Sequence, residues 1–227
     1  MAVIFLLILT GVFHGYVSGY PAKGYALHFP HQGVTDYANV WGMRSLTQFT
    51  VCFWMKSSAS NPGTPFSYAV PGQDNELLIY NYNGFELFIG GERKEVHESA
   101  NDGRWHHICV SWRNSDGVWQ FYKDGALHIH TRGLRKGYTI QGGGSLTLGV
   151  EQDSVGGRFE SNQSFQGSLT NVNVWSYVLS ASTVKSMSTS CLSGVGNVYK
   201  WSDFIYGVKG KAAVVIPSPC YPPSSRG

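Results

Sequence analysis

Residues 105–133 read WHHICVSWRNSDGVWQFYKDGALHIHTRG, and this stretch decides the fold class. It contains three runs of alternating apolar and polar residues that are rich in aromatic and β-branched side chains, at 105–112, 118–125 and 127–133. Such runs, separated by Asn, Ser, Asp and Gly, are typical of β-strands. The Asp124-Gly125 pair, which ends the second run and precedes the third, is a strong hairpin signal. The stretch therefore predicts antiparallel strands.

Similar runs extend along most of the chain. They are FTVCFWMKS (49–57), LLIYNY (77–82), FELFIGG (85–91), SLTLGVE (145–151) and LTNVNVWSYVL (169–179). Many short strands separated by turn residues favour an all-β fold, a two-sheet antiparallel sandwich or jelly roll. One short helix is expected near 181–188, because Ser180 is a suitable N-cap residue in front of Ala181.

Composition favours one large domain. The chain has 227 residues, with 28 glycines and 14% aromatic but only 14% charged side chains. No linker or internal repeat divides it, so residues 20–217 are expected to form a single domain. The Pro- and Ser-rich end, residues 218–227, is expected to be a flexible tail. A net charge of +3 without a basic run does not favour a nucleic-acid-binding function.

The first residues predict the compartment. Val3–Thr10 is an apolar run that is too short to span a bilayer, and small residues follow at Val17-Ser18-Gly19. We expect residues 1–19 to be a signal peptide and the mature protein to be secreted. The alternative is a buried core strand at the start of the chain. No second long apolar run occurs, so no membrane span is expected.

The chain has four cysteines, and an even number in a secreted protein suggests two disulfides among three possible pairings. Cys52 and Cys109 both lie in strand-like runs, so we expect them to pair across two strands. Cys191 and Cys220 both lie in the last segment and are expected to pair. The alternative is that Cys220 lies in a loose tail and bonds another chain.

Residues 151–163, EQDSVGGRFESNQ, predict a calcium site. Side chains that bear oxygen crowd this loop, and the Gly156-Gly157 pair allows a sharp turn. Closely packed carboxylates repel one another unless a cation lies among them. Hard oxygen ligands without paired His or Cys indicate Ca²⁺ rather than zinc or copper. Asp74 and Asn75, which precede the strand-like run LLIY, offer a second set of oxygens if the sandwich brings that corner against the loop.

The chain resembles the pentraxin family, the group of C-reactive protein and serum amyloid P component. The motif His107-Ile108-Cys109-Val110-Ser111-Trp112 is similar to the family signature His-x-Cys-x-Ser/Thr-Trp. The similarity covers about residues 25–217. It includes QDNELLIY (73–80), KGYT (136–139), LGVEQDSVGGRFESNQS (148–164) and NVNVWSYVLS (171–180), in the family's order. The resemblance implies a jelly-roll sandwich like those of lectins and laminin-G domains.

The resemblance also implies a site that holds two Ca²⁺ ions per subunit, with Asp153 between them and Gln152 coordinating through its main-chain carbonyl. The family's ligand positions fall on Asp74, Asn75, Glu151, Gln152, Asp153, Glu160 and Gln163. Ligand-pocket positions fall on Leu78, Tyr80 and Phe88. In the family an acidic residue meets the choline cation, but Arg93 stands near that position here. The ligand therefore stays open among phosphocholine, phosphoethanolamine and acidic glycans.

Further expectations follow from the resemblance. The family forms cyclic pentamers that recognise repetitive surfaces such as microbes or cell debris in innate immunity and the acute phase, with complement or phagocyte receptors as further partners. Asn162-Gln163-Ser164 is an N-glycosylation sequon inside the calcium loop. A glycan on Asn162 would crowd the ligand face, or the sequon is unused.

Other functional classes fit the sequence less well, and we do not expect an enzyme. Glu151 and Asp153 could serve as glycoside hydrolase carboxylates, but Val155 and Gly156 occupy the positions where a third acid would follow. No Gly-x-Ser-x-Gly motif is present. His128 and His130 share a strand face but lack a nearby third zinc ligand. The main alternative is a laminin-G-like adhesion module in which calcium is structural.

Overall fold

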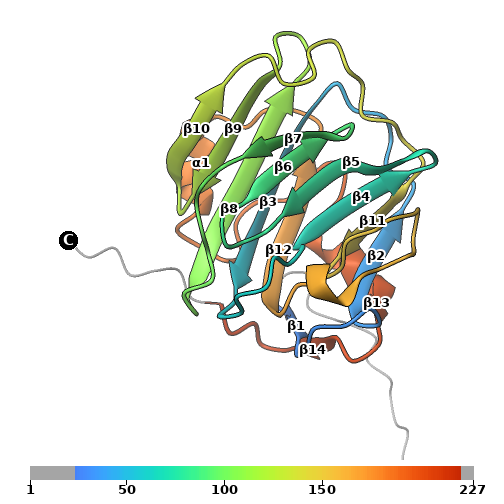
Figure 1. Ribbon diagram of the computed structural model, residues 1–227. Helices are drawn as coiled ribbons and strands as arrows, with labels where there is room; N and C mark the ends of the chain where they lie inside the picture. Colours follow the sequence, from blue (N-terminus) through green and yellow to red (C-terminus); the bar gives the residue numbers. More distant parts are fainter. Residues whose placement is uncertain (1–23, 221–227) are drawn as a thin grey trace, which may run out of the picture.

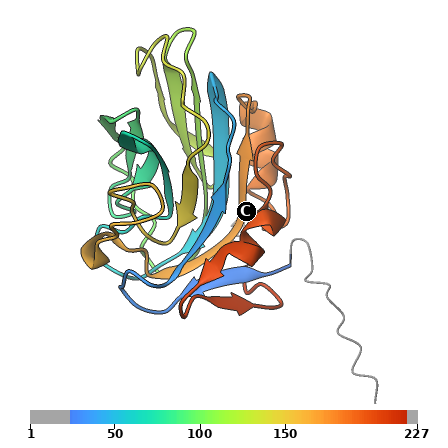
Figure 2. The ribbon, with the colours of Figure 1, turned by 90° about the vertical axis from the view of Figure 1, so that its right-hand side faces the viewer.

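The computed structural model describes residues 24–220 as a sandwich of two antiparallel seven-stranded sheets, seen face-on in Figure 1 and edge-on in Figure 2. This confirms the expected all-β sandwich. Residues 1–23 and 221–227 lie outside the described part of the chain, so the expected signal peptide does too. No helix within residues 24–220 is long and apolar enough to cross a membrane.

The first sheet contains the strands predicted from residues 105–133. Its order is β10-β9-β8-β3-β12-β1-β14, and all of its pairings are antiparallel. The strands are β10 (Ala126–Thr131), β9 (Val118–Lys123), β8 (Trp105–Arg113), β3 (Gln48–Lys56), β12 (Gly167–Trp175), β1 (Ala26–Phe29) and β14 (Ala213–Val215).

The second sheet carries the predicted ligand residues. Its order is β13-β2-β11-β4-β5-β6-β7. The strands are β13 (Val208–Lys209), β2 (Tyr37–Trp41), β11 (Ser145–Leu148), β4 (Phe66–Val70), β5 (Gln73–Tyr80), β6 (Glu86–Ile89) and β7 (Glu92–Glu95). Two 3₁₀ turns, η1 (Ser161–Gln163) and η2 (Trp201–Gly207), were not expected, because such short elements leave no periodic pattern in a sequence.

The predicted local signals are present. Asp124 and Gly125 join β9 to β10 with φ angles of 51° and 78°, as a two-residue hairpin of the primed type requires. The expected helix is α1 (Ala181–Met187), and the Ser180 hydroxyl accepts a hydrogen bond from the Thr183 N–H at 3.1 Å. Both signals are local, so they act without tertiary help.

The central strand β3 is buried on both faces. Phe49, Val51 and Phe53 point into the core between the sheets, whereas Cys52 and Trp54 belong to two smaller clusters on the outer face. Figure 2 shows why: α1 and the last part of the chain cover the outside of this sheet. The golden loop that carries η1 covers the outside of the other sheet, at the opposite side of the molecule.

Both expected disulfides are present, Cys52–Cys109 between β3 and β8 and Cys191–Cys220 near the end of the chain. The second one anchors residues 218–220, the first part of the expected tail. The Trp105 indole N–H donates to the Pro219 carbonyl at 3.0 Å, and the Ser218 N–H donates to the Gly24 carbonyl at 2.8 Å. These three residues are therefore attached to the first sheet.

His106 lies between two carboxylates at one end of β8. Its Nδ1 is 2.7 Å from Asp124 Oδ2, and its Nε2 is 2.9 Å from Asp102 Oδ1. Burial by itself lowers the pKa of His106, but the hydrogen bonds and charges of the two aspartates outweigh burial and raise it. Burial by itself raises the pKa of Asp124, but its hydrogen bonds with the His106 ring and the His107 N–H, together with the charges of His106 and Lys123, outweigh burial and lower it.

We expect this cluster to make stability depend on pH. The stabilisation through His106 is complete below its unfolded pKa of about 6.5 and is lost as pH rises through the folded pKa. The stabilisation through Asp124 is present above about pH 4 and is lost as pH falls through its lowered folded pKa. Urea unfolding of calcium-free Asp124→Asn should therefore show a weaker loss of stability above about pH 6.5 than the parent protein.

The matched control is Asp116→Asn, because Asp116 is paired with Arg113 and contacts no histidine in the described residues. This variant should keep the parent pH dependence above about pH 6.5. An unchanged slope in Asp124→Asn would show that the Asp124 carboxylate does not control the titration of His106.

Candidate calcium and ligand site

The 151–163 loop is tied to the outer face of the second sheet by a buried glutamine. The Gln152 amide donates to the carbonyls of Ser67 on β4 and Ser145 on β11, at 2.8 and 3.0 Å. Its side-chain oxygen accepts from the Gly156 N–H at 2.8 Å. These bonds engage both ends of the Gln152 amide inside the protein, which is consistent with the expectation that Gln152 would meet calcium through its main-chain carbonyl.

Four buried oxygens near this loop have no hydrogen-bond partner in the described structure. They are Asn75 Oδ1, both carboxylate oxygens of Glu151, and Gln163 Oε1. Buried polar atoms are almost always hydrogen-bonded, since leaving them unpaired is unfavourable. All four are hard acceptors, and hard acceptors are the ligands that Ca²⁺ takes. The residues present therefore fit a calcium ion.

The electrostatics agree with this fit. Burial, followed by the charges of Asp153, Asp74 and Glu160, raises the pKa of Glu151 to about 7. The side chain is only 4% exposed, so water screens these charges weakly. A cation among these carboxylates would remove both the repulsion and the unpaired charge.

The remaining predicted calcium residues are more open. Asp153 and Glu160 are exposed and Asp74 is half-buried, with its Oδ1 accepting from the Asn75 N–H at 2.9 Å. Asp74 and Asp153 also border a second cavity of about 310 Å³ beside the β4–β5 turn. The fold thus brings both predicted oxygen sets, from the start of β5 and from the loop, to one place.

The three predicted ligand-pocket residues meet four of the seven predicted calcium residues at one cavity of about 130 Å³, and Asp74, Gln152 and Glu160 do not line it. Leu78 and Tyr80 come from β5, and Phe88 lies opposite Leu78 on β6. The oxygens described above form the other side. The lining residues are Asn75, Leu78, Tyr80, Phe88, Glu151, Asp153 and Gln163.

An ion-pair network borders the apolar wall. Arg93 on β7 lies opposite Phe88, and its guanidinium is 2.7 Å from Glu86 Oε2 and 2.9 Å from Glu95 Oε1. Glu86 lies opposite Tyr80 and is nearly buried. Burial, followed by the charges of Glu86 and Glu151, raises the pKa of Tyr80, so its hydroxyl stays protonated. The pocket therefore combines an apolar wall, a hydroxyl and charges of both signs.

Glu76 is a structural residue of this site that the sequence did not reveal. Its fully buried carboxylate accepts from the Tyr138 hydroxyl and the Gln141 N–H, both at 2.6 Å. These bonds join the start of β5 to the segment before β11. In the sequence, Glu76 is only an acidic residue directly after Asp74-Asn75. Its hydrogen bonds in the structure show that it stabilises the fold.

A family model described as the Pentaxin family matches residues 25–217. The chain belongs to the pentraxin family. A similar relative is the Sushi, von Willebrand factor type A, EGF and pentraxin domain-containing protein 1 of Rattus norvegicus, 44% identical over 198 residues, 85% of this chain and 6% of the relative. Human neuronal pentraxin-2 is 42% identical over 171 residues, 74% of this chain and 40% of the relative. The chain thus spans less than half the length of these relatives.

Among solved structures, the pentraxin domain is similar to the native heptameric SAP-like pentraxin of Limulus polyphemus. The TM-score is 0.72 with 25% identity, and the match covers 87% of this chain and 93% of that one. The likeness therefore extends over most of the sandwich.

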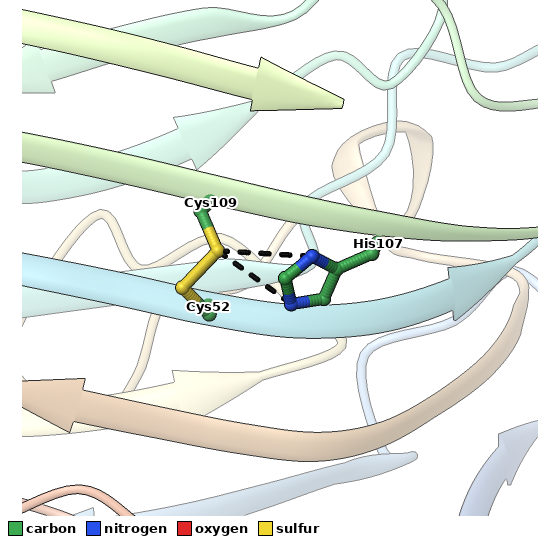
Figure 3. A group of neighbouring side chains, drawn as sticks. All are labelled: Cys52, His107 and Cys109. Carbon is green, nitrogen blue, oxygen red and sulfur yellow. Dashed lines mark hydrogen bonds between the residues drawn. A yellow bond between two sulfur atoms is a disulfide. The ribbon is translucent and has the colours of Figure 1, made fainter. Parts of the chain in front are cut away.

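The pentraxin domain has a second cluster of metal-ligand residue types, Cys52, His107 and Cys109 (Figure 3). The two cysteines are bonded to each other, and a His107 ring nitrogen lies 3.6 Å from the Cys109 sulfur. Burial lowers the pKa of His107 to about 4, so the ring is neutral. A disulfide offers no thiolate ligands, so this cluster is a packed core feature and not a metal site.

The remaining predicted positions lie on the surface. Asn162 is exposed on η1, next to Gln163, so the sequon faces solvent at the edge of the pocket. His128 and His130 are exposed on β10, and His128 Nδ1 is 2.8 Å from Glu98 Oε1. No third ligand joins the two histidines among the described residues.

Proposed function

We propose that this pentraxin domain is a secreted, calcium-dependent recognition module, and not an enzyme, that binds phosphate- or carboxylate-bearing ligands. The observation that carries the proposal is the set of unpartnered buried oxygens of Asn75, Glu151 and Gln163, which face one cavity together with an apolar wall. A cluster that is unfavourable without a cation becomes a binding site with one.

Two Ca²⁺ ions per subunit are proposed. When bound, calcium supplies positive charge and open coordination positions for an anionic oxygen of the ligand. The chain's own residues hold the ions and shape the pocket around them. The proposed ligands to calcium are Asp74, Asn75, Glu151, the carbonyl of Gln152, Asp153, Glu160 and Gln163.

The apolar wall sets what else the ligand can carry. Leu78, Tyr80 and Phe88 offer two aromatic faces beside the predicted ions. An ammonium group against such faces gains roughly 0.5–2 kcal/mol from cation–π contact. Phosphocholine, phosphoethanolamine and acidic glycans are the proposed ligand classes.

Assembly into a cyclic oligomer fits weak individual sites. Sites arrayed on one face gain avidity of about 10²–10⁴-fold on repetitive surfaces such as microbes or cell debris, which suits a role in innate immunity. A pentamer is proposed from the family resemblance, and the relative from Limulus polyphemus is a heptamer. We further propose a signal peptide at 1–19, the pentraxin domain at 20–217 and a terminal tail at 218–227.

The proposal is tested by retention on phosphocholine and phosphoethanolamine resins in Ca²⁺, with release by EDTA. Asp153→Ala should lose retention on any resin that holds the parent protein. The matched control is Glu98→Ala, because Glu98 is an acid that contacts Lys123 and His128 away from the loop. This variant should be retained normally.

The outcomes separate the candidates. Calcium binding by calorimetry without retention on either resin would favour the second candidate, a laminin-G-like adhesion module with structural calcium. Elution by a free headgroup would exclude that candidate, since a protein contact does not compete with a small phosphate ester. Absence of calcium binding would overturn the proposal.

Calcium should also protect the loop from trypsin. Arg158 is exposed and directly follows the Gly156-Gly157 turn, so it is accessible to a protease. Without calcium the carboxylates around Glu151 repel one another and loosen the loop. We expect cleavage after Arg158 to be at least about tenfold slower in Ca²⁺ than in EDTA, since proteolysis follows the population of the open form.

The products would be identified by mass spectrometry, and Arg158→Gln, which removes the cleavage site, is the control. Equal rates of cleavage at Arg158 in Ca²⁺ and in EDTA would contradict calcium binding by this loop.

A further inference from the structure

Trp41 is an unusually exposed tryptophan at the end of β2. Its side chain is 56% exposed, whereas the other six tryptophans of the chain are at most 6% exposed. A large aromatic ring left half in water contributes only part of its possible burial energy to the fold. The position of Trp41 therefore calls for a local explanation.

The indole of Trp41 lies directly against the 151–163 loop. A Cβ atom added to Gly156 would lie 2.8 Å from Trp41 Cη2, so only glycine allows the ring to approach this closely. Gly156 also has φ of 71°, which a glycine adopts without strain. The ring thus packs on the sharp turn in the middle of the loop.

This contact belongs to a row on one strand. Tyr37, four residues earlier on β2 and on the same face, packs against Phe159 with ring centroids 5.0 Å apart. Trp41 and Tyr37 therefore touch the loop on both sides of Arg158. Trp41 also lies opposite Ser145 on β11, and the Ser145 carbonyl accepts a hydrogen bond from the Gln152 side-chain amide.

The sheet order places contacts to the 151–163 loop on two sides, from β2 and from β5. β2 and β5 are separated by β11 and β4, and the loop crosses the outer face between them. β5 supplies Asp74 and Asn75 on one side, while β2 supplies only aromatic packing on the other. Oxygens from the loop and from β5 can bind the same calcium ion only if the loop is held at a fixed distance from the sheet.

We propose that Trp41, supported by Tyr37, is a positioning residue that holds the 151–163 loop in the arrangement that binds calcium. This inference rests on the proposed function for its effect on calcium affinity. Trp41 supplies no ligand atom, so its effect passes through Gly156 and the backbone of the loop. Residues that orient ligands from outside commonly change metal affinity by about 10–100-fold when they are replaced.

The test compares the parent protein with Trp41→Ala, Trp41→Phe and Tyr177→Ala. Tyr177 is the matched control, because it is another aromatic residue with 43% exposure but lies close to α1. Calorimetry should give a calcium Kd about tenfold weaker for Trp41→Ala, with partial recovery in Trp41→Phe and no change in Tyr177→Ala. The thermal midpoint in EDTA should stay close to the parent value, since Trp41 is outside the core.

Two further readouts report on the loop without measuring calcium affinity. In EDTA, trypsin should cut after Arg158 several-fold faster in Trp41→Ala than in the parent protein, because the loop opens more often. Acrylamide quenching in the parent protein reports mainly on Trp41, the exposed ring, and calcium should reduce this quenching as the loop tightens.

The outcomes distinguish the two claims. Equal calcium Kd and equal cleavage rates for the parent protein and Trp41→Ala would overturn the positioning role and leave the proposed function intact. If trypsin cleaves Trp41→Ala faster than the parent protein in EDTA but the parent protein binds no calcium, the proposed function would be overturned. The positioning of the loop by Trp41 would still hold. Weaker calcium binding by Tyr177→Ala as well would also overturn the specific role of Trp41.

Discussion

Glu151→Gln should lose calcium binding and at the same time make the calcium-free protein more stable. The Glu151 carboxylate is buried without a hydrogen-bond partner and is repelled by Asp153, Asp74 and Glu160. Neutralising it removes an unpaired buried charge, which should raise the free energy of unfolding in EDTA by about 1–2 kcal/mol. The calcium Kd should weaken by more than about 100-fold, beyond the usual effect of residues outside the coordination sphere.

The matched comparison is Asp153→Asn, because Asp153 is a proposed calcium ligand of the same charge but is exposed. This variant should also lose calcium affinity but gain little stability in EDTA, since water already solvates the carboxylate. Urea unfolding with and without Ca²⁺ would measure both quantities. A calcium-free Glu151→Gln protein that is less stable than the parent would show that Glu151 has a favourable structural role instead.

Removal of the Cys52–Cys109 disulfide should cause the largest loss of stability. The bonded residues are 57 positions apart, so loop-closure entropy alone predicts a loss of about 4 kcal/mol in the double variant Cys52→Ala, Cys109→Ala. Both cysteines also pack with Trp175, Val184 and Met187 under α1, so their truncation loosens that contact as well. Denaturant unfolding would measure the change.

The Cys191→Ala, Cys220→Ala variant is the control. Its residues are 29 positions apart, and the same relation predicts about 3.6 kcal/mol, but its main effect should be local release of residues 218–220 from Trp105 and Gly24. Both bonds lie on the first sheet, away from the pocket, so folded protein of either variant should bind calcium as the parent does. Equal unfolding curves for the parent and Cys52→Ala, Cys109→Ala would contradict a stabilising role for the central bond.

Several features followed from short-range patterns. Alternation over residues 105–133 predicted strands β8, β9 and β10, and Asp124-Gly125 predicted the turn between the last two. Ser180 predicted the start of α1. These features were predictable because hairpin turns and helix caps depend on the conformations and hydrogen bonds of residues that are close in the chain.

Other features depended on contacts between distant residues. Glu76 looked like one more acid at the start of a strand, but Tyr138 and Gln141 enclose it, 62 and 65 positions away. Nothing in the pattern around Trp41 indicated a contact with Gly156. The tail residues 218–220 looked loose by composition, whereas Trp105 and the disulfide hold them.

The sequence by itself determined the sandwich class, the family and the oxygen-rich character of the proposed calcium site, since these depend on periodicity, motif order and residue type. Only the tertiary structure decided that Asn75, Glu151 and Gln163 turn unpartnered oxygens toward one cavity with Leu78, Tyr80 and Phe88. The physical reason is that burial and charge repulsion depend on distances through space. Sheet order and the anchoring of the loop by Gln152 and Trp41 set those distances across more than 70 positions of sequence.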